Sequence, residues 1–65
     1  MEEVKTMYRE ARKQAGIRPE RAAAELGVSI TTLLSWERND TRPNADNIRK
    51  MAQLYGMSAD VLIGV

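Results

Sequence analysis

Cysteine, histidine and phenylalanine are absent from this 65-residue sequence. Without cysteine the chain has no disulfide and no thiolate ligand for a metal. Without histidine it lacks the commonest metal ligand and the usual general base near neutral pH. The carboxylates show no spacing that is typical of a catalytic pocket. We therefore predict no metal site, no cofactor and no enzymatic activity.

Net charge and long apolar runs are also nearly lacking. Ten Lys and Arg balance nine Asp and Glu, so the net charge of +1 gives no global argument for nucleic acid or membrane binding. No apolar run approaches the ~20 residues that span a bilayer, and the acidic N-terminus lacks the apolar core of a signal peptide. We expect a cytoplasmic protein in which residues 1–65 form one domain. Whether it is a complete small protein or the N-terminal domain of a longer one stays open.

Apolar residues recur at spacings of three and four, which is typical of helices. The apolar face of an N-terminal helix is formed by Val4, Met7, Tyr8, Ala11 and Ala15. Gly16 is expected to end this helix in a left-handed conformation. A second, short helix begins near Pro19, whose missing N–H costs little in a first turn, and ends at Gly27.

Polar residues mark the starts of three more helices. Ser29, Asn44 and Ser58 each precede an apolar pattern, and their side-chain oxygens suit the free N–H groups of a first turn. Asn39 is expected to end the third helix, because Asn tolerates a positive φ. No segment sustains the period of two that a strand requires. The sequence therefore predicts an all-α domain of five short helices.

The larger apolar side chains are assigned to the core of this domain. Trp36 and Leu62 are predicted to point inward. Tyr8 and Tyr55 are expected to bury their rings and to leave their hydroxyls near water. We also assign three methionines to the core or its margin: Met7, Met51 and Met57.

Residues 19–38 have the spacing of a helix-turn-helix. Ala23 is small enough to let the following helix approach closely, and Gly27 supplies the positive φ of a tight turn. The two helices are held against the core by Leu26, Val28, Leu33 and Trp36. The opposite face of the third helix points outward, and a helix of this diameter fits the major groove of B-DNA.

The order of these motifs resembles the phage repressor and Cro-like (XRE-type) helix-turn-helix domains. The matching elements, within residues 4–63, are Leu26-Gly27-Val28-Ser29, Trp36-Glu37-Arg38, Arg42-Pro43-Asn44, Leu54-Tyr55-Gly56-Met57-Ser58 and Asp60-Val61-Leu62-Ile63. The resemblance implies a compact five-helix, lambda-repressor-like fold. It also implies a sequence-specific transcriptional regulator, repressor-like, that binds double-stranded DNA through the third helix.

The resemblance assigns roles to individual residues. Base contacts are expected from Ile30, Thr31, Leu34 and Ser35. Phosphate contacts are expected from Arg18, Arg21, Ser29, Thr32, Arg38, Thr41 and Arg42. Arg12 and Glu37 hold the positions of an ion pair that ties the first helix to the third. We assign this pair to architecture rather than to DNA recognition.

Two features depart from the family pattern. Family members often place Gln, Arg or Asn on the base-reading face, where forked polar groups read a base pair bidentately. In this chain the four base-contact candidates have shorter side chains, and two of them are apolar. Ile30 and Thr31 suit thymine methyl groups, so more of the discrimination is expected to rest on DNA shape. Pro19 stands where many members have a phosphate-contacting Gln, a contact that Arg18 or Arg21 can replace.

The apolar C-terminal end predicts self-association. One short turn cannot bury Val61, Ile63 and Val65 together, so these residues are candidates for a two-fold homodimer contact. Such a dimer places two recognition helices ~34 Å apart, which is one turn of DNA. Two alternatives stay open: the antitoxin of a toxin–antitoxin pair, and a protein-interaction module that has lost DNA binding.

Overall fold

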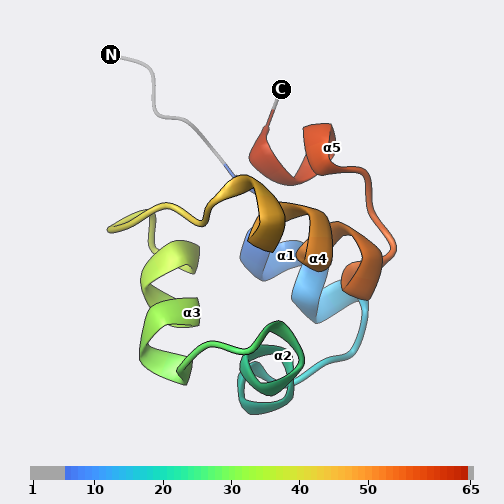
Figure 1. The fold of residues 1–65 in the computed structure, drawn as a ribbon. Coiled ribbons are helices and arrows are strands. Elements are labelled where there is room, and N and C mark those ends of the chain that lie inside the picture. Colours follow the sequence, from blue (N-terminus) through green and yellow to red (C-terminus); the bar gives the residue numbers. More distant parts are fainter. Residues whose placement is uncertain (1–5, 65) are drawn as a thin grey trace.

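Five helices joined by short loops make up the described part of the chain, residues 6–64 of a computed structural model (Figure 1). They are α1 (Tyr8–Gln14), α2 (Pro19–Leu26), α3 (Ile30–Glu37), α4 (Ala45–Tyr55) and α5 (Ala59–Ile63). Residues 6–64 contain no strand, so the all-α prediction is confirmed. Among these residues, no helix combines the length and hydropathy needed to cross a membrane.

Side-chain caps begin α3, α4 and α5 at the residues that the sequence predicts. A backbone N–H in the first turn of each helix donates to Ser29 Oγ at 3.1 Å, Asn44 Oδ1 at 2.8 Å and Ser58 Oγ at 3.3 Å. Each bond satisfies a donor that the helix itself leaves unpaired. Asn39 follows α3 with a φ of 64°, as its tolerance of the left-handed region predicts.

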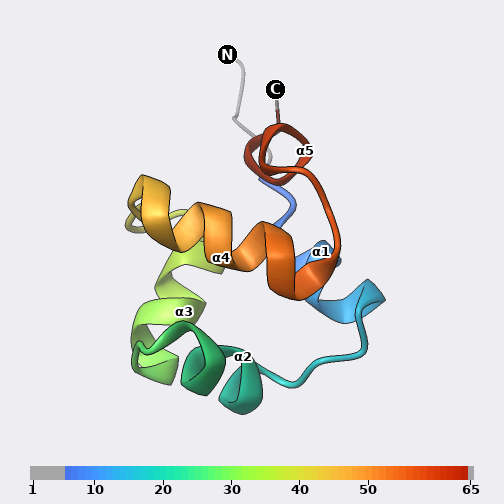
Figure 2. The same cartoon turned by 45° about the vertical axis from the view of Figure 1, so that its right-hand side comes forward.

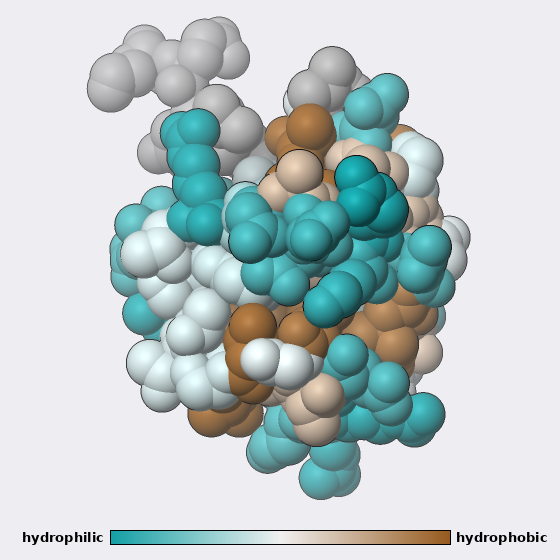
Figure 3. All heavy atoms as spheres, viewed as in Figure 1, coloured by the Kyte–Doolittle hydropathy of each residue, from teal (hydrophilic) through white to brown (hydrophobic). Residues whose placement is uncertain are grey.

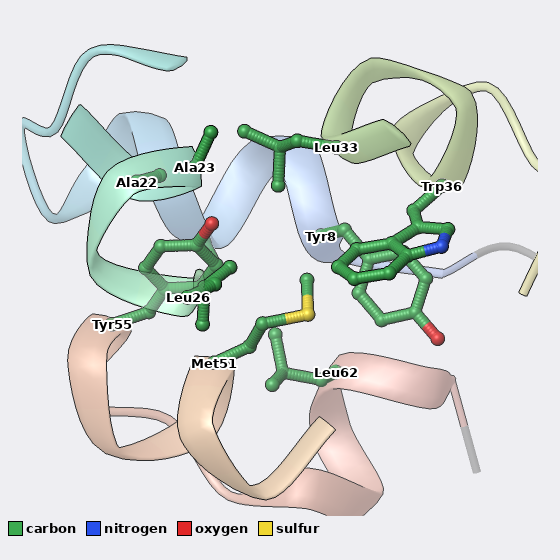
Figure 4. Packing of buried hydrophobic residues seen from close by; sticks show 10 residues of the cluster. Tyr8, Ala22, Ala23, Leu26, Leu33, Trp36, Met51, Tyr55 and Leu62 are labelled. Carbon is green, nitrogen blue, oxygen red and sulfur yellow. The ribbon is translucent and has the colours of Figure 1, made fainter. Parts of the chain in front are cut away.

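One hydrophobic cluster draws side chains from all five helices (Figure 4). Leu33, Met51 and Leu62 are fully buried within it. Trp36 is 5% exposed, so its assignment to the core, like that of Leu62, is confirmed. The complete set is Tyr8, Ala11, Ala22, Ala23, Leu26, Leu33, Trp36, Met51, Tyr55 and Leu62.

The helix-turn-helix and the C-terminal helix lie at opposite ends of the molecule. α2 and α3 pack together at one end, α4 passes between the two ends, and α5 lies at the other (Figures 1 and 2). The amide of Met7 donates to the carbonyl of Leu62 at 2.7 Å and so fixes the start of α1 to α5. The outward face of α3 is therefore far from α5 and is left open.

The structure corrects two expectations. Ala15 is exposed and does not join the apolar face of α1, because the helix ends at Gln14 and the chain turns at Gly16. The hydroxyl of Tyr55 is buried rather than near water, because the last turn of α4 packs against α1 and α2. Val4, predicted on the same face as Ala15, lies outside the described residues.

Candidate nucleic-acid interface

The turn between α2 and α3 sets the direction of the exposed helix. Gly27 has a φ of 74°, the left-handed conformation that glycine adopts without a Cβ penalty. The amide of Val28 donates to the carbonyl of Ala23 at 3.0 Å, which satisfies a carbonyl in the last turn of α2. Ala23 is 4% exposed, so its small side chain lies within the contact between the two helices. These features hold α3 with one face in the core and the other outward.

The outward face of α3 carries the four residues assigned to base contacts. Ile30 is 38% exposed and Thr31 is exposed, while Leu34 and Ser35 are half-buried. Ile30 and Leu34 are one helical turn apart and lie on the same face. The first turn of α3 therefore offers a partner the apolar side chain of Ile30 and the hydroxyl of Thr31, which makes no side-chain hydrogen bond among residues 6–64.

Four of the polar side chains near this face already pair in two hydrogen bonds within the chain. Ser29 Oγ donates to Thr32 Oγ1 at 3.0 Å, in addition to its capping bond. The hydroxyls of Ser35 and Thr41 lie 2.8 Å apart and share a hydrogen bond. This second bond ties the middle of α3 to the loop before α4. A contact from Ser35 to a base therefore competes with an existing partner.

The four arginines assigned to phosphate contacts are all exposed and lie on the segments that flank α3: Arg18, Arg21, Arg38 and Arg42. Arg38 Nε lies 3.0 Å from Asp40 Oδ2, and Arg21 Nε lies 4.0 Å from Glu25 Oε2. Both pairs are exposed, so each contributes little to stability and leaves its arginine available. Arg18 and Arg42 have no ion-pair partner within residues 6–64.

Arg12 and Glu37 form a buried, bidentate ion pair beneath this surface. Arg12 Nε donates to Glu37 Oε2 at 2.7 Å and Nη2 donates to Oε1 at 3.2 Å. The side chains are 9% and 3% exposed. A third bond, from Arg12 Nη1 to the carbonyl of Ile17 at 3.0 Å, holds the loop between α1 and α2. The hydrogen bond to Glu37 raises the pKa of Arg12 above its usual value.

Tyr55 lies next to this ion pair. Burial, reinforced by the negative charge of Glu37, raises the pKa of Tyr55 to about 12, and the charge of Arg12 opposes the shift. The hydroxyl is buried and has no hydrogen-bond partner within residues 6–64. The sequence predicts the pairing of Arg12 with Glu37 but does not place Tyr55 beside it, because the tyrosine lies on another helix, α4.

Two hollows lie near α3, one against its exposed side and one between the loop that follows α3 and the helices α1, α4 and α5. One, of about 350 Å³, is lined by Arg9, Arg12, Pro19, Leu34, Glu37 and Arg38. The other, of about 770 Å³, is lined by Thr6, Tyr8, Arg38, Asn39, Thr41, Arg42, Pro43, Ile48 and Ile63. Each combines apolar walls with arginines at the surface.

A helix-turn-helix family model matches residues 9–62 of the chain. The chain therefore belongs to the helix-turn-helix family. It is 36% identical over 56 residues to the HTH-type transcriptional regulator ImmR of Bacillus subtilis (strain 168). The match covers 86% of this chain but 44% of ImmR, so the chain spans less than half of that regulator's length.

Solved structures give the same family. The P22 c2 repressor, in a crystal structure with a synthetic operator, superposes with a TM-score of 0.82 at 28% identity, covering 95% of this chain and 96% of that one. The solution structure of the DNA-binding domain of the P22 c2 repressor superposes with a TM-score of 0.84 at 29% identity, covering 97% of this chain and 87% of that one. The predicted phage repressor-like, five-helix fold is therefore confirmed.

Within this helix-turn-helix domain the predicted site residues fall into two groups. The base and phosphate candidates gather on α3 and on the segments beside it. The dimer candidates lie on α5, where Val61 is 46% exposed and Ile63 is half-buried against the core, in the hollow that Arg38, Thr41 and Arg42 also line. Val65 lies outside the described residues. Sequence reasoning missed Arg9, which lines the same hollow as Leu34, and the helical spacing of Arg9 from Arg12 was the available signal.

Proposed function

We propose that this chain binds double-stranded DNA sequence-specifically, as the DNA-binding domain of a repressor-like transcriptional regulator. The observation that carries the proposal is the open face of α3, set by a tight turn after α2 and flanked by four exposed arginines. The P22 c2 repressor has the same fold, is 28% identical and was crystallised in complex with a synthetic operator, which supports this assignment. In this proposal α3 enters the major groove.

Phosphate contacts and base contacts are divided between different residues. Arg18 and Arg42, which lack ion-pair partners among the described residues, are the strongest phosphate candidates. Arg21 and Arg38 join them after releasing exposed acidic neighbours. Thr31 is the base candidate whose hydroxyl makes no side-chain hydrogen bond among residues 6–64. The remaining phosphate candidates are Ser29, Thr32 and Thr41.

A homodimer completes the proposal. Few arginines face the DNA, so one copy of the domain contacts few phosphates and binds weakly. Two copies related by a two-fold axis and joined through Val61 and Ile63 of α5 place two α3 helices ~34 Å apart over a palindromic operator. Occupation of that operator blocks the polymerase, which is the repressor mode that the family resemblance implies.

The test is binding to duplex DNA at two salt concentrations in the presence of random competitor. We expect binding at low salt with a slope of log K against log salt of about −0.9 for each phosphate contacted. Arg42→Ala should weaken binding to all sequences alike and reduce the slope by about one phosphate, whereas Thr31→Ala should change the preference among sites. Lys50→Ala removes an exposed positive charge from the middle of α4, next to the end of α2, and serves as the control. No binding at low salt would reject the proposal.

A further inference from the structure

The larger hollow, of about 770 Å³, is lined by none of the four base-contact candidates. Its apolar walls come from Tyr8 of α1, Ile48 of α4 and Ile63 of α5, and the loop after α3 adds Pro43. The two isoleucines are half-buried, so part of their surface is open to a ligand. Figure 3 shows brown and tan surface around α5 beside teal surface over the start of α4. The volume and the apolar walls are typical of a site for a small organic molecule.

The charged lining of this hollow is wholly positive. It includes Arg38 and Arg42, and none of the described residues that line it is Asp or Glu. Arg38 pairs with exposed Asp40, whereas Arg42 has no ion-pair partner among residues 6–64. Burial raises the pKa of Tyr8, and the positive charge of Arg42 opposes this shift, so the guanidinium acts on the apolar interior of the hollow. The hollow therefore suits a ligand with one negative charge.

Hydrogen bonds hold the walls of the hollow in place. Thr6 Oγ1 donates to Asn39 Oδ1 at 3.1 Å, which joins the start of the described chain to the loop after α3. The hydroxyl of Thr41, on the same loop, lies 2.8 Å from that of Ser35. The backbone bond between the start of α1 and α5 fixes another wall. A site whose walls are already in place loses less conformational entropy when it binds a ligand.

A cation beside apolar side chains matches one class of ligand, an organic acid with an apolar body. A guanidinium group binds a carboxylate through two parallel hydrogen bonds, and apolar walls remove the body of the acid from water. We propose that this hollow binds a small organic carboxylate, whose carboxyl group pairs with Arg42 and whose apolar body packs against Ile48 and Ile63. A neutral apolar molecule forms no ion pair with Arg42, and a short-chain acid leaves the walls in water, so both bind more weakly.

The acid opposes the binding of DNA, a step that rests on the proposed function. Arg42 is one of the two strongest phosphate candidates, and its paired donors cannot hold a carboxylate and a phosphate at the same time. Because the two ligands compete for one guanidinium, each lowers the affinity for the other by the same factor. The carboxylate therefore acts as an inducer that releases the domain from its operator.

The first test titrates the chain with phenylbutanoate and follows the backbone amides by NMR. Phenylbutanamide is the neutral control with the same apolar body, and butanoate is the anionic control without the ring. We expect saturable shifts at Arg42, Ile48 and Ile63, and an affinity about tenfold higher than for either control. Arg42→Gln should remove the preference for the carboxylate over the amide. Arg49→Gln, an exposed arginine next to Ile48 that does not line the hollow, should keep it.

The second test measures the affinity for a duplex selected from a random library. Saturating phenylbutanoate should weaken binding about tenfold. Butanoate at the same concentration controls for ionic strength, which also weakens DNA binding. The Arg42→Gln variant should bind DNA more weakly than the parent and should not respond to phenylbutanoate. Arg42 is exposed, so this variant keeps the packing of the core.

The outcomes distinguish this inference from the proposed function. Equal affinity for phenylbutanoate and its amide, or shifts that lie away from the hollow, overturns the carboxylate site. Shifts at the hollow that follow the concentration of the chain alone assign the hollow to a second copy and also overturn it. Unchanged DNA affinity at saturating phenylbutanoate overturns the role as inducer. Absence of DNA binding without any ligand rejects the proposed function, and the NMR titration of the free chain still decides the site.

Discussion

Arg12 is the residue on which three segments of the molecule depend. It donates to both oxygens of Glu37 on α3 and to the carbonyl of Ile17 in the loop before α2. Arg12→Ala leaves the Glu37 carboxylate, 3% exposed, without its partner, and breaking such a pair costs about 3–5 kcal/mol. A domain of this size has a total stability of similar magnitude. Urea denaturation should therefore find the variant largely unfolded at 25 °C.

Two further variants keep this expectation testable. Arg49→Ala removes an exposed ion pair with Asp46 on α4 and should change the free energy of unfolding by at most about 1 kcal/mol. Replacing both Arg12 and Glu37 by Met leaves no buried charge and should recover part of the loss. If Arg12→Ala is no more damaging than Arg49→Ala, the pair does not support the fold.

The buried hydroxyl of Tyr55 predicts a loss of stability in alkali. The phenolate is the disfavoured form in the folded state, where the pKa is about 12, against about 10 in the unfolded chain. The folded state therefore holds the proton more tightly. This contribution is complete below pH 10 and is lost as the pH rises through 12, with a limit of about 2–3 kcal/mol. Denaturant titrations at pH 9 and pH 11.5 measure the difference.

Tyr55→Phe isolates this contribution from those of the other groups in the chain. Its hydroxyl has no hydrogen-bond partner among residues 6–64, so at pH 7 the substitution should leave stability within about 1 kcal/mol of the parent. The stability difference between parent and variant should then shift in favour of Phe as the pH rises from 9 to 11.5. A difference that is independent of pH contradicts the burial of an unpaired phenol.

At the scale of the elements, the turn before α3 depends on the conformation of Gly27. A Cβ built at this position meets no atom within 4 Å, so Gly27→Ala introduces backbone strain at a φ of 74° without a clash. The expected cost is about 1 kcal/mol, and Gly27→Asn should cost less, because Asn tolerates the left-handed region. Thermal denaturation orders the three proteins as Gly, Asn, Ala from most to least stable. Equal stability of Ala and Gly contradicts a strained position.

The helices were predictable where a local rule decides their ends. The caps at Ser29 and Asn44 and the left-handed Asn39 follow from the chemistry of single side chains. The end of α1 also followed, since Gly16 comes directly after the cap residue Ala15 and has a φ of 72°, but the exposure of Ala15 did not, because the helical spacing alone places Ala15 on the apolar face. The bond between Ser35 and Thr41 was also hidden, since it depends on how the loop before α4 returns to α3.

At the scale of the whole molecule, the net charge of +1 does not show how the charges are distributed between the interior and the surface. Arg12 and Glu37 cancel one another inside the fold, while exposed arginines lie on the segments beside α3. The Arg12–Glu37 contact and the exposed α3 face were predicted from family motifs. Three features could not be predicted, because each depends on how several helices pack together. They are the burial of that ion pair, the burial of the Tyr55 hydroxyl and the hollow beside Leu34.

The surface near α5 predicts how two copies cooperate on DNA. Val61 is 46% exposed, whereas Ile63 packs partly against the core, so Val61→Asn tests the dimer contact without emptying the core. The parent should bind a duplex with two half-sites, spaced one helical turn apart, far more tightly than a duplex with one. A two-fold contact loses the substituted side chain twice, so the variant should reduce this advantage by about 10- to 30-fold. Binding to one half-site should stay unchanged, because α5 lies away from α3. Gln53→Asn, an exposed neutral change on α4, serves as the control. An undiminished advantage in the Val61 variant places the dimer contact elsewhere.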